Sequence, residues 1–346
     1  MNTTIEDKQA DAGAAVGQVM GLALGYLVSR SLHVATELGV ADHLADGPLD
    51  AHTLAARCGA RPDALRRVLR TLAAHGVFVE DAQNRFALNA PSSLLRRGVM
   101  RDGVLLCGEV TGDGSWWNAV GALRESVTSG EPAFDRQHGM GFFDYMRARP
   151  DCAAWFDRGM ATFAAAENPA VASAYDFRDF EHVVDIGGGQ GGLLARILER
   201  EPALRATLFD LPHVIADPAE LRACASAAGR WQGVAGDFFE AVPPGADAYV
   251  LKRIVHDWSD DACVRLLRRC REAMRGDARL LIVDAVVPPG NEPHPAKVMD
   301  ILMMVFAGGR ERTRDEFEQL LWQAGLRLAR VLPTASTLSI IEAARV

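Results

Sequence analysis

Five glycines within six residues, at 187–192, directly follow a short apolar run at 182–186. The letters are HVVDI and then GGGQGG. Such a junction is typical of a strand that turns sharply into a helix, because glycine permits tight turns. Glycine also lets the backbone approach a ligand without a Cβ atom in the way. Two patterns fit the loop: G-x-G-x-x-G, the dinucleotide fingerprint, and D-x-G-x-G-x-G, which other nucleoside-binding proteins use. The loop therefore predicts a nucleoside site without naming its ligand.

From residue 181 onward, short β-rich runs alternate with helical stretches. Such alternation predicts βαβ units and a mostly parallel sheet. Two late runs, at 326–333 and 336–344, leave little room for a crossover between them, so we expect them to pair antiparallel at one edge. The other expected strands lie at 182–186, 206–210, 247–252 and 279–285, and the expected helices at 192–201, 214–228, 259–274 and 313–324.

The chain before about residue 165 has a mostly helical pattern. Residues 61–76 repeat apolar residues at helical spacing, and residues 77–88 resemble a hairpin with a polar turn. A helix followed by a hairpin is the outline of a winged helix, which raises the hypothesis of DNA binding. The net charge of −8 argues against a DNA-binding surface. The arginines on or near the candidate recognition helix are Arg61, Arg66, Arg67 and Arg70.

Near the N-terminus, glycine recurs at every fourth position: Gly13, Gly17, Gly21 and Gly25, hereafter the glycine stripe. On a helix these residues form one smooth face on which a second helix can lie closely. That second helix could belong to the same chain or to a partner, and the sequence leaves both open. The apolar segment at 14–28 that contains most of the stripe is shorter than the roughly 20 residues of a membrane span.

The composition limits the class of protein. A chain of 346 residues suits two domains, and 49% apolar residues exclude a disordered chain. The six cysteines form no C-x-x-C pair, which favours reduced thiols in a cytoplasmic protein over disulfides or a zinc site. The N-terminus has no basic segment of the kind that begins a signal peptide.

Later strand ends discriminate between the two ligand patterns. Asp210 ends the second strand, where an acidic residue binds ribose hydroxyls in either kind of site. Asp237 and Phe238 end the third strand, where a carboxylate can accept a hydrogen bond from an adenine amine and a ring can cover the base. The fourth strand ends in VHDW, at 255–258, which has no role in the dinucleotide pattern.

Five motifs occur together in this order: DIGGGQGG, LFDLP, GDFF, LKRIVHDWSD and GGRERTRDEF. In this combination the sequence resembles the S-adenosylmethionine-dependent small-molecule O-methyltransferases, namely the plant caffeate and isoflavone type and their bacterial polyketide and phenazine relatives. The resemblance extends from about residue 15 to the C-terminus.

The resemblance implies an α/β fold in which a mainly α winged-helix dimerisation domain precedes a Rossmann-like class I methyltransferase domain. We expect a flexible segment at 1–12, the dimerisation domain at 13–105, a helical segment lining the acceptor pocket at 106–178 and the cofactor-binding domain at 179–346. It also implies a homodimer with no nucleic-acid or membrane partner.

The implied cofactor is S-adenosylmethionine, with S-adenosylhomocysteine as product and no metal. By its match to the family motifs, the cofactor site consists of Asp185, Gly187, Gly189, Asp210, Leu211, Gly236, Asp237, Phe238 and Lys252.

The expected reaction needs a base. A phenol with a pKa of about 10 is ionised at pH 7 at a cost of roughly 4 kcal/mol, and histidine is the side chain suited to accept its proton. His256 matches the family's catalytic base and lies just past the fourth strand end. The resemblance points to Asp284 and Glu311 as the residues that hold the imidazole, although the plant members more often carry the longer Glu at the first position.

The acceptor site is expected from the aromatic-rich segment at 106–175 and from the helix at 295–309. Asp257 could contact the acceptor or serve a structural role. The candidate acceptor residues are Phe143, Trp155, Phe156, Met160, Asn168, Asp257 and Met303.

The sequence thus predicts O-methylation of an aromatic small molecule in secondary metabolism. Two alternatives stay open: a homologue that uses the fold for hydroxylation or decarboxylation, and a winged-helix regulator that senses a nucleoside. A dehydrogenase that binds NAD drops out unless titration shows nicotinamide binding.

Overall fold

The structure of the protein is a computed structural model that describes residues 5–108 and 115–346. The chain divides into two compact units. The first consists of the chain before Ser115 together with Ala154–Thr162, and the second of Ser115–Ala153 together with Phe163–Val346. The long helix α11 (Pro150–Ala174) therefore contributes residues to both units.

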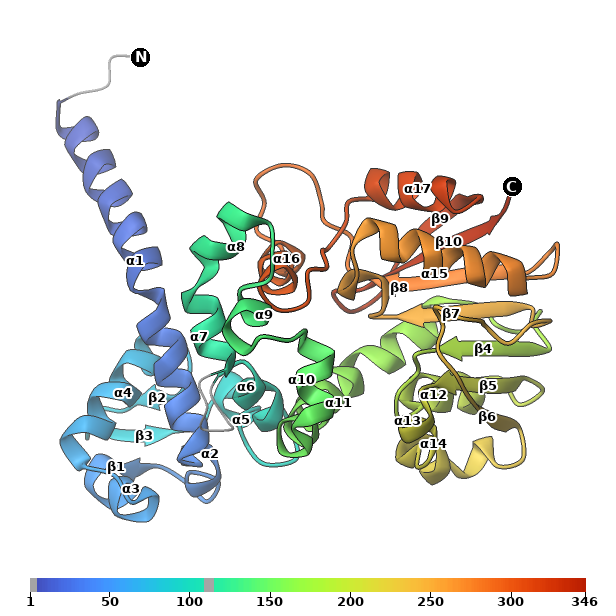
Figure 1. Ribbon diagram of the computed structural model, residues 1–346. Helices are drawn as coiled ribbons and strands as arrows, with labels where there is room; N and C mark the ends of the chain where they lie inside the picture. The colour runs from blue at the N-terminus through green and yellow to red at the C-terminus, as the bar shows by residue number, and fades with distance from the viewer. Residues whose placement is uncertain (1–4, 109–114) are drawn as a thin grey trace. The chain divides into compact units, whose positions relative to one another are not determined.

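The first unit is mainly helical, with a small antiparallel sheet in the order β1-β3-β2 (blue to cyan in Figure 1). Pro62 occupies the first position of helix α4, where its missing N–H costs nothing, and Gly76 follows the helix with a φ of 78°. The predicted helix at 61–76 and hairpin at 77–88 are confirmed. The elements are α1 (Ile5–Glu37), α2 (Val40–His43), β1 (Leu49–Asp50), α3 (Ala51–Cys58), α4 (Pro62–Ala74), β2 (Val79–Glu80), β3 (Arg85–Ala87), α5 (Ala90–Ser93) and α6 (Arg101–Leu106).

Helix α1 carries the glycine stripe and begins at Ile5, inside the segment predicted to be flexible. Among the described residues, nothing lies within 4 Å of the position that a Cβ would take at any stripe glycine. The apolar side chains beside the stripe are exposed, and Leu22 exposes 78% of its surface. Within the described residues of the first unit, no side chain therefore packs on the stripe. No described helix is long and apolar enough to cross a membrane.

The second unit contains a seven-stranded sheet in the order β6-β5-β4-β7-β8-β10-β9 (Figure 1). The strands from β4 to β8 pair in parallel, and β10 pairs antiparallel with both β8 and β9. The predicted parallel sheet and antiparallel edge are confirmed. Winding proceeds outward in both directions from β4, so the ends of β4 and β7 border the crevice where such sheets bind ligands. The strands are β4 (His182–Ile186), β5 (Arg205–Asp210), β6 (Trp231–Ala235), β7 (Ala248–Lys252), β8 (Arg279–Asp284), β9 (Leu326–Pro333) and β10 (Ser339–Arg345).

Apolar side chains cover the sheet on both faces. Leu266 and Phe317 belong to one core cluster with Tyr249, and Leu194 belongs to the other with Val183. The helix predicted at 214–228 is instead three short pieces, since Pro218 cannot continue the helical hydrogen bonds. The elements are α12 (Gly192–Arg200), α13 (Pro212–Ile215), α14 (Ala219–Ala223), η1 (Ala225–Ala227), η2 (Val255–Asp257), α15 (Asp260–Ala273) and α17 (Arg314–Gln323).

A layer of short helices in the second unit packs through aromatic rings. Trp116 contacts Phe142 and Phe306 with ring centroids 5.3 and 4.5 Å apart, and Phe134 contacts Phe142 at 5.4 Å. Most of these rings are core, as expected for apolar side chains of this size. The helices are α7 (Ser115–Gly121), α8 (Leu123–Ser129), α9 (Ala133–His138), α10 (Phe142–Ala148) and α16 (Pro295–Phe306).

Candidate functional site

The glycine loop lies at the carboxyl end of β4. Gly187 and Gly189 have φ values of 68° and 58°, a conformation that other residues rarely adopt. A Cβ at Gly187 would lie 2.5 Å from Ile254 Cδ1 and 3.7 Å from Phe238 Cε1, so side chains already border the loop. At Gly189 a Cβ would meet nothing within 4 Å among the described atoms. The loop therefore presents bare backbone at an open position.

Two carboxylates border this loop. Asp210 ends β5 and accepts hydrogen bonds from the backbone N–H of Gly189, at 2.9 Å, and of Leu211, at 2.7 Å. Burial raises the pKa of Asp210, and these two N–H groups partly offset the rise. Asp185 is fully buried, and burial raises its pKa to about 7 against the opposing charge of Lys252. Within the described residues Asp185 Oδ2 has no hydrogen-bond partner, so it can accept one from a ligand.

Three residues of the predicted cofactor site directly follow β6, and two of them, Asp237 and Phe238, were predicted to contact the adenine. Gly236 is required by packing, because a Cβ there would lie 2.6 Å from the Phe209 ring. Asp237 is exposed, and its Oδ1 accepts a hydrogen bond from the backbone N–H of Phe239 at 2.8 Å. That bond gives Asp237 a turn-forming role. Phe238 is half-buried and meets the Trp258 ring edge-on at 6.2 Å.

Lys252 ends β7 and forms an ion pair that the sequence did not predict. Its Nζ lies 3.0 Å from Glu167 Oε2, and Arg253 Nη2 lies 2.5 Å from Glu167 Oε1. Burial raises the pKa of Glu167, but the two cations outweigh it and hold that pKa below its usual value. Glu167 belongs to α11, and a single acidic residue in a helix gives no signal that could have identified this contact.

His256 lies in the 3-10 turn η2, directly after β7, and is buried. Its Nδ1 lies 2.8 Å from Glu311 Oε1, across 55 residues of sequence. Its Nε2 lies 3.5 Å from Asp257 Oδ1. The predicted contact between His256 and Glu311 is thus present, and it orients the ring by one nitrogen.

The charges around His256 set its pKa. Burial lowers the pKa of the imidazole, but the carboxylates of Asp257, Asp284 and Glu311 outweigh burial and raise it to about 9. Burial also raises the pKa of Asp257, while the charges of His256 and Arg253 oppose that rise. The site therefore favours a protonated imidazole at neutral pH.

Asp284 ends β8 and is completely buried. Neither of its carboxylate oxygens has a hydrogen-bond partner in the described part of the chain, so no hydrogen bond joins it to His256. Burial raises the pKa of Asp284 to about 7, opposed by the positive charge of His256. Asp284 thus acts on His256 through its charge, whereas Glu311 contacts the ring.

The predicted acceptor residues divide between the two units. In the second unit, Phe143 stacks on Trp258 at 5.6 Å with an interplanar angle of 18°, which brings it beside the turn that carries His256. Asn168 is buried with no partner for its Oδ1 among the described atoms, and Met303 is half-buried on α16. The remaining three belong to the first unit: Trp155, Phe156 and Met160.

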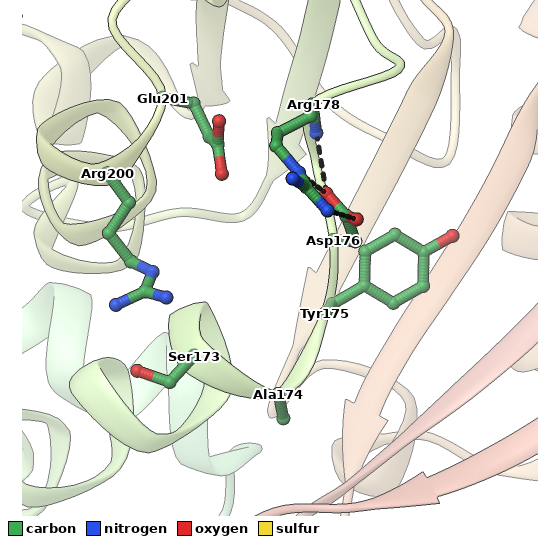
Figure 2. A pocket seen from close by; sticks show the side chains of 7 residues that line it. All are labelled: Ser173, Ala174, Tyr175, Asp176, Arg178, Arg200 and Glu201. Atoms are coloured by element: carbon green, nitrogen blue, oxygen red, sulfur yellow. Dashed lines mark hydrogen bonds and ion pairs between the residues drawn. The ribbon is translucent and has the colours of Figure 1, made fainter.

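A polar hollow of about 440 Å³ lies elsewhere in the second unit (Figure 2). Arg178 pairs with Asp176 inside it, and Arg200 and Glu201 come from the end of α12 and the residue after it. It contains none of the predicted site residues. Its exposed ion pair is typical of a solvated surface.

The ends of β4, β5 and β6 fit a nucleoside cofactor. The loop offers backbone without a Cβ, Asp210 lies where ribose hydroxyls bind in such folds, and the unpartnered Asp185 Oδ2 can accept a hydrogen bond. The described residues contain no cluster of three or more groups able to hold a metal ion.

Comparison with known proteins agrees with this geometry. A family model for the O-methyltransferase domain matches residues 120–327, and one for the O-methyltransferase dimerisation domain matches residues 20–98. Phenazine O-methyltransferase PhzM of Lysobacter antibioticus is 40% identical over 341 residues, which cover 98% of each chain. Mitomycin biosynthesis 6-O-methyltransferase of Streptomyces lavendulae is 39% identical over 346 residues, 97% of this chain and 96% of the relative.

A solved structure extends the similarity to three dimensions. The SAH-bound form of CalO1, a methyltransferase in calicheamicin biosynthesis, matches with a TM-score of 0.87 and 39% identity over 96% of this chain and 98% of that chain. The predicted fold class and cofactor are thereby confirmed, and the NAD and regulator alternatives lose their support. The chain therefore belongs to the S-adenosylmethionine-dependent O-methyltransferase family, with a dimerisation domain preceding the catalytic domain.

Proposed function

We propose that the protein methylates a hydroxyl of an aromatic small molecule in secondary metabolism, with His256 as general base. The observation that carries the proposal is the buried His256 held through Nδ1 by Glu311 at 2.8 Å, at the end of the strand next to the glycine loop. S-Adenosylmethionine supplies a methyl group already activated on a sulfonium. The remaining task for the protein is to orient the acceptor and remove its proton.

The hydrogen bond from Nδ1 to Glu311 leaves Nε2 of His256 as the nitrogen that accepts the proton. Transfer from a phenol of pKa about 10 to an imidazole of pKa about 9 costs only ~1.4 kcal/mol. At pH 7, however, about one imidazole in a hundred is neutral at that pKa, so deprotonating His256 adds ~2.7 kcal/mol. The gain from the base therefore grows as the pH rises towards 9.

For the cofactor we propose the residues at the ends of β4 to β7. The backbone of Gly187 and Gly189 would approach the amino-acid part of the cofactor, beside Asp185. Asp210 would accept hydrogen bonds from the ribose. The other proposed contacts are Leu211, Gly236, Asp237, Phe238 and Lys252.

For the acceptor we propose an apolar wall of aromatic and methionine side chains. Phe143 supports this, since it stacks on Trp258 next to the catalytic turn. We propose that residues 106–178 line this pocket, that 179–346 bind the cofactor and that 13–105 dimerise. The other proposed acceptor contacts are Trp155, Phe156, Met160, Asn168, Asp257 and Met303.

We further propose a cytoplasmic homodimer formed through α1, with no nucleic-acid or membrane partner. The exposed glycine stripe and its apolar neighbours support a helix of a second chain as the occupant. Within the described residues no disulfide joins two cysteines, as suits a reducing compartment. In light scattering, Gly21→Glu should convert the dimer to a monomer. A mass unchanged from that of the unmodified protein would contradict this interface.

The experiment for the reaction combines the purified protein and S-adenosylmethionine with hydroxylated phenazine and naphthoate acids as probe acceptors. Formation of S-adenosylhomocysteine with an O-methylated product supports the proposal. An N-methylated product, or a hydroxylated or decarboxylated one, would replace it.

The base is tested with the acceptor that reacts. His256→Ala should lower turnover by about 10²- to 10⁴-fold while the affinity for S-adenosylhomocysteine stays within about threefold, since the ring is not part of the loop. His75→Ala is the matched control, because His75 lies exposed after helix α4 of the first unit. Full turnover in the His256 variant would show that another group accepts the proton.

A further inference from the structure

The turn that carries His256 is contacted by four consecutive residues from a distant segment, at 309–312. A Cβ at Gly309 would lie 2.0 Å from the carbonyl oxygen of His256, so only glycine permits this approach. The backbone N–H of Arg310 donates to the same oxygen at 2.9 Å. Glu311 then binds the imidazole at Nδ1. The backbone and the side chain of His256 are thus held by neighbouring residues of one segment.

Arg312 extends this contact to both sides of His256. Its side chain is 1% exposed. Its Nη1 donates to the carbonyl oxygen of Val255 at 2.9 Å, and its Nη2 donates to the carbonyl oxygen of Trp258 at 2.9 Å. These carbonyls come one residue before and two residues after His256, so one rigid guanidinium spans the whole turn.

Arg312 is held in two ways, by an ion pair of its side chain and by hydrogen bonds of the backbone around it. Asp260 Oδ1 accepts from Nη2 at 2.7 Å and from Nε at 3.0 Å, and the side chain of Asp260 is 54% exposed. On the backbone side, the carbonyl of Arg312 accepts from the N–H of Val287 at 2.9 Å. The next residue, Thr313, caps helix α17 by a reciprocal capping box. The backbone of Arg312 is therefore fixed on both sides, by Val287 and by the cap of α17. The carboxylate that pairs with its guanidinium, Asp260, is half-exposed.

We propose that Arg312 is a positioning residue for the methyl-transfer reaction. By bonding to the carbonyls on both sides of His256, it keeps Nδ1 of the imidazole in contact with Glu311 and holds Nε2 in one direction. Burial of a guanidinium is costly unless acceptors surround it, and here two of the acceptors are the backbone of the catalytic turn. The inference rests on the proposed role of His256.

The test follows His256 directly, in full-length protein with isotope-labelled histidine, and needs no acceptor. His256 is assigned by comparison with His256→Ala, and its titration is followed by NMR. In the unmodified protein we expect a pKa of about 9. In Arg312→Met we expect that pKa to fall, because the ring loses its hydrogen bond to Glu311. We also expect hydrogen exchange at Asp257 and Trp258 to rise about tenfold, and the affinity for S-adenosylhomocysteine to stay within about threefold.

Two further variants make the outcome decisive. Asp260→Asn keeps an acceptor for Arg312 and leaves its bonds to the carbonyls in place, so the His256 titration should stay unchanged. If Arg312→Met does not fold, Arg312→Lys keeps the charge but cannot bridge both carbonyls, and an intermediate shift is expected. An unaltered His256 titration in a folded Arg312 variant overturns the inference, as does an equal shift in Asp260→Asn.

This test and the test of the base fail separately. Full turnover of His256→Ala would remove the catalytic role of the ring but would leave the measured titration intact. An unaltered titration in Arg312→Met would remove the positioning role and leave the base assignment standing.

Discussion

The glycine loop after β4 and the histidine turn after β7 end neighbouring parallel strands, yet they are built in opposite ways. The loop works through backbone: positive φ angles, missing Cβ atoms and the N–H of Gly189, which donates to Asp210, 21 residues away. The turn works through side chains, and the group that orients His256 comes from 55 residues away. A site made of backbone depends on neighbouring residues, so a short sequence motif can reveal it. A cluster of buried charges joins residues far apart in the chain, and no short motif reveals it.

The difference also separates binding from chemistry. Changes in the loop should alter affinity for the cofactor, and changes around the turn should alter the protonation and orientation of His256. Variants in the loop should therefore change cofactor affinity and spare turnover, and variants around the turn should do the reverse. Variants that change both equally would contradict this division between loop and turn.

Among the variants that compare the turn with the loop, the largest effect is expected at Glu311. Glu311→Ala removes the acceptor of His256 Nδ1, so the ring loses its orientation, and turnover should fall by about 100-fold. Affinity for S-adenosylhomocysteine, measured by calorimetry, should change by less than about threefold. The matched control is Glu318→Ala, an exposed acidic residue on α17. An equal loss of cofactor affinity in Glu311→Ala would show that the turn and the loop act as one unit.

A smaller effect, on affinity, is expected in the loop. Gly187→Ala forces a Cβ into a residue at φ 68° and to 2.5 Å from Ile254 Cδ1, so cofactor affinity should fall by about 10- to 100-fold. Gly189→Ala meets the same backbone restriction in open space, and its loss should be smaller. Turnover at saturating cofactor should change little in both. Equal losses in the two variants would show that contact with Ile254 adds nothing.

The smallest effect is a displacement of the pH profile. The proposed base, His256, accepts a proton only when it is neutral, and three carboxylates hold its pKa at about 9, so turnover should rise with pH and level off above that value. Asp284→Asn removes one of the charges that favour the cation, so the inflection should move to lower pH. Turnover measured from pH 6 to 10 checks both expectations, and a profile centred below pH 7 in the unmodified protein would contradict the protonated resting state.

Much of the fold was predictable because its signals are local. The apolar runs and their alternation with helices predicted the parallel sheet, and the short connection between the last two runs predicted the antiparallel edge. The broken helix at 214–228 was missed, although Pro218 was visible as its cause. The insertion of β10 between β8 and β9 depends on long-range pairing, which no local pattern carries.

The candidate site shows the same limit. Gly187, Asp210 and His256 were identified in the sequence because each stands at a strand end within a motif. Glu167 was missed because it is one acidic residue among many in a long helix. Arg312 lies in the motif GGRERT, but only its neighbour Glu311 was predicted to have a role in the site.

By itself the sequence indicated the order of strands and helices along the chain, the glycine loop and His256 as the candidate base, because these depend on residues close together in the chain. Tertiary structure decided which carboxylate contacts that histidine: Glu311 at 2.8 Å forms the hydrogen bond, and the shorter Asp284 acts only through its charge. It also decided that a guanidinium, at Arg312, spans the turn that carries His256. The physical reason is that a buried charge must find its partners in space, and folding alone brings residues of such wide separation within hydrogen-bond distance.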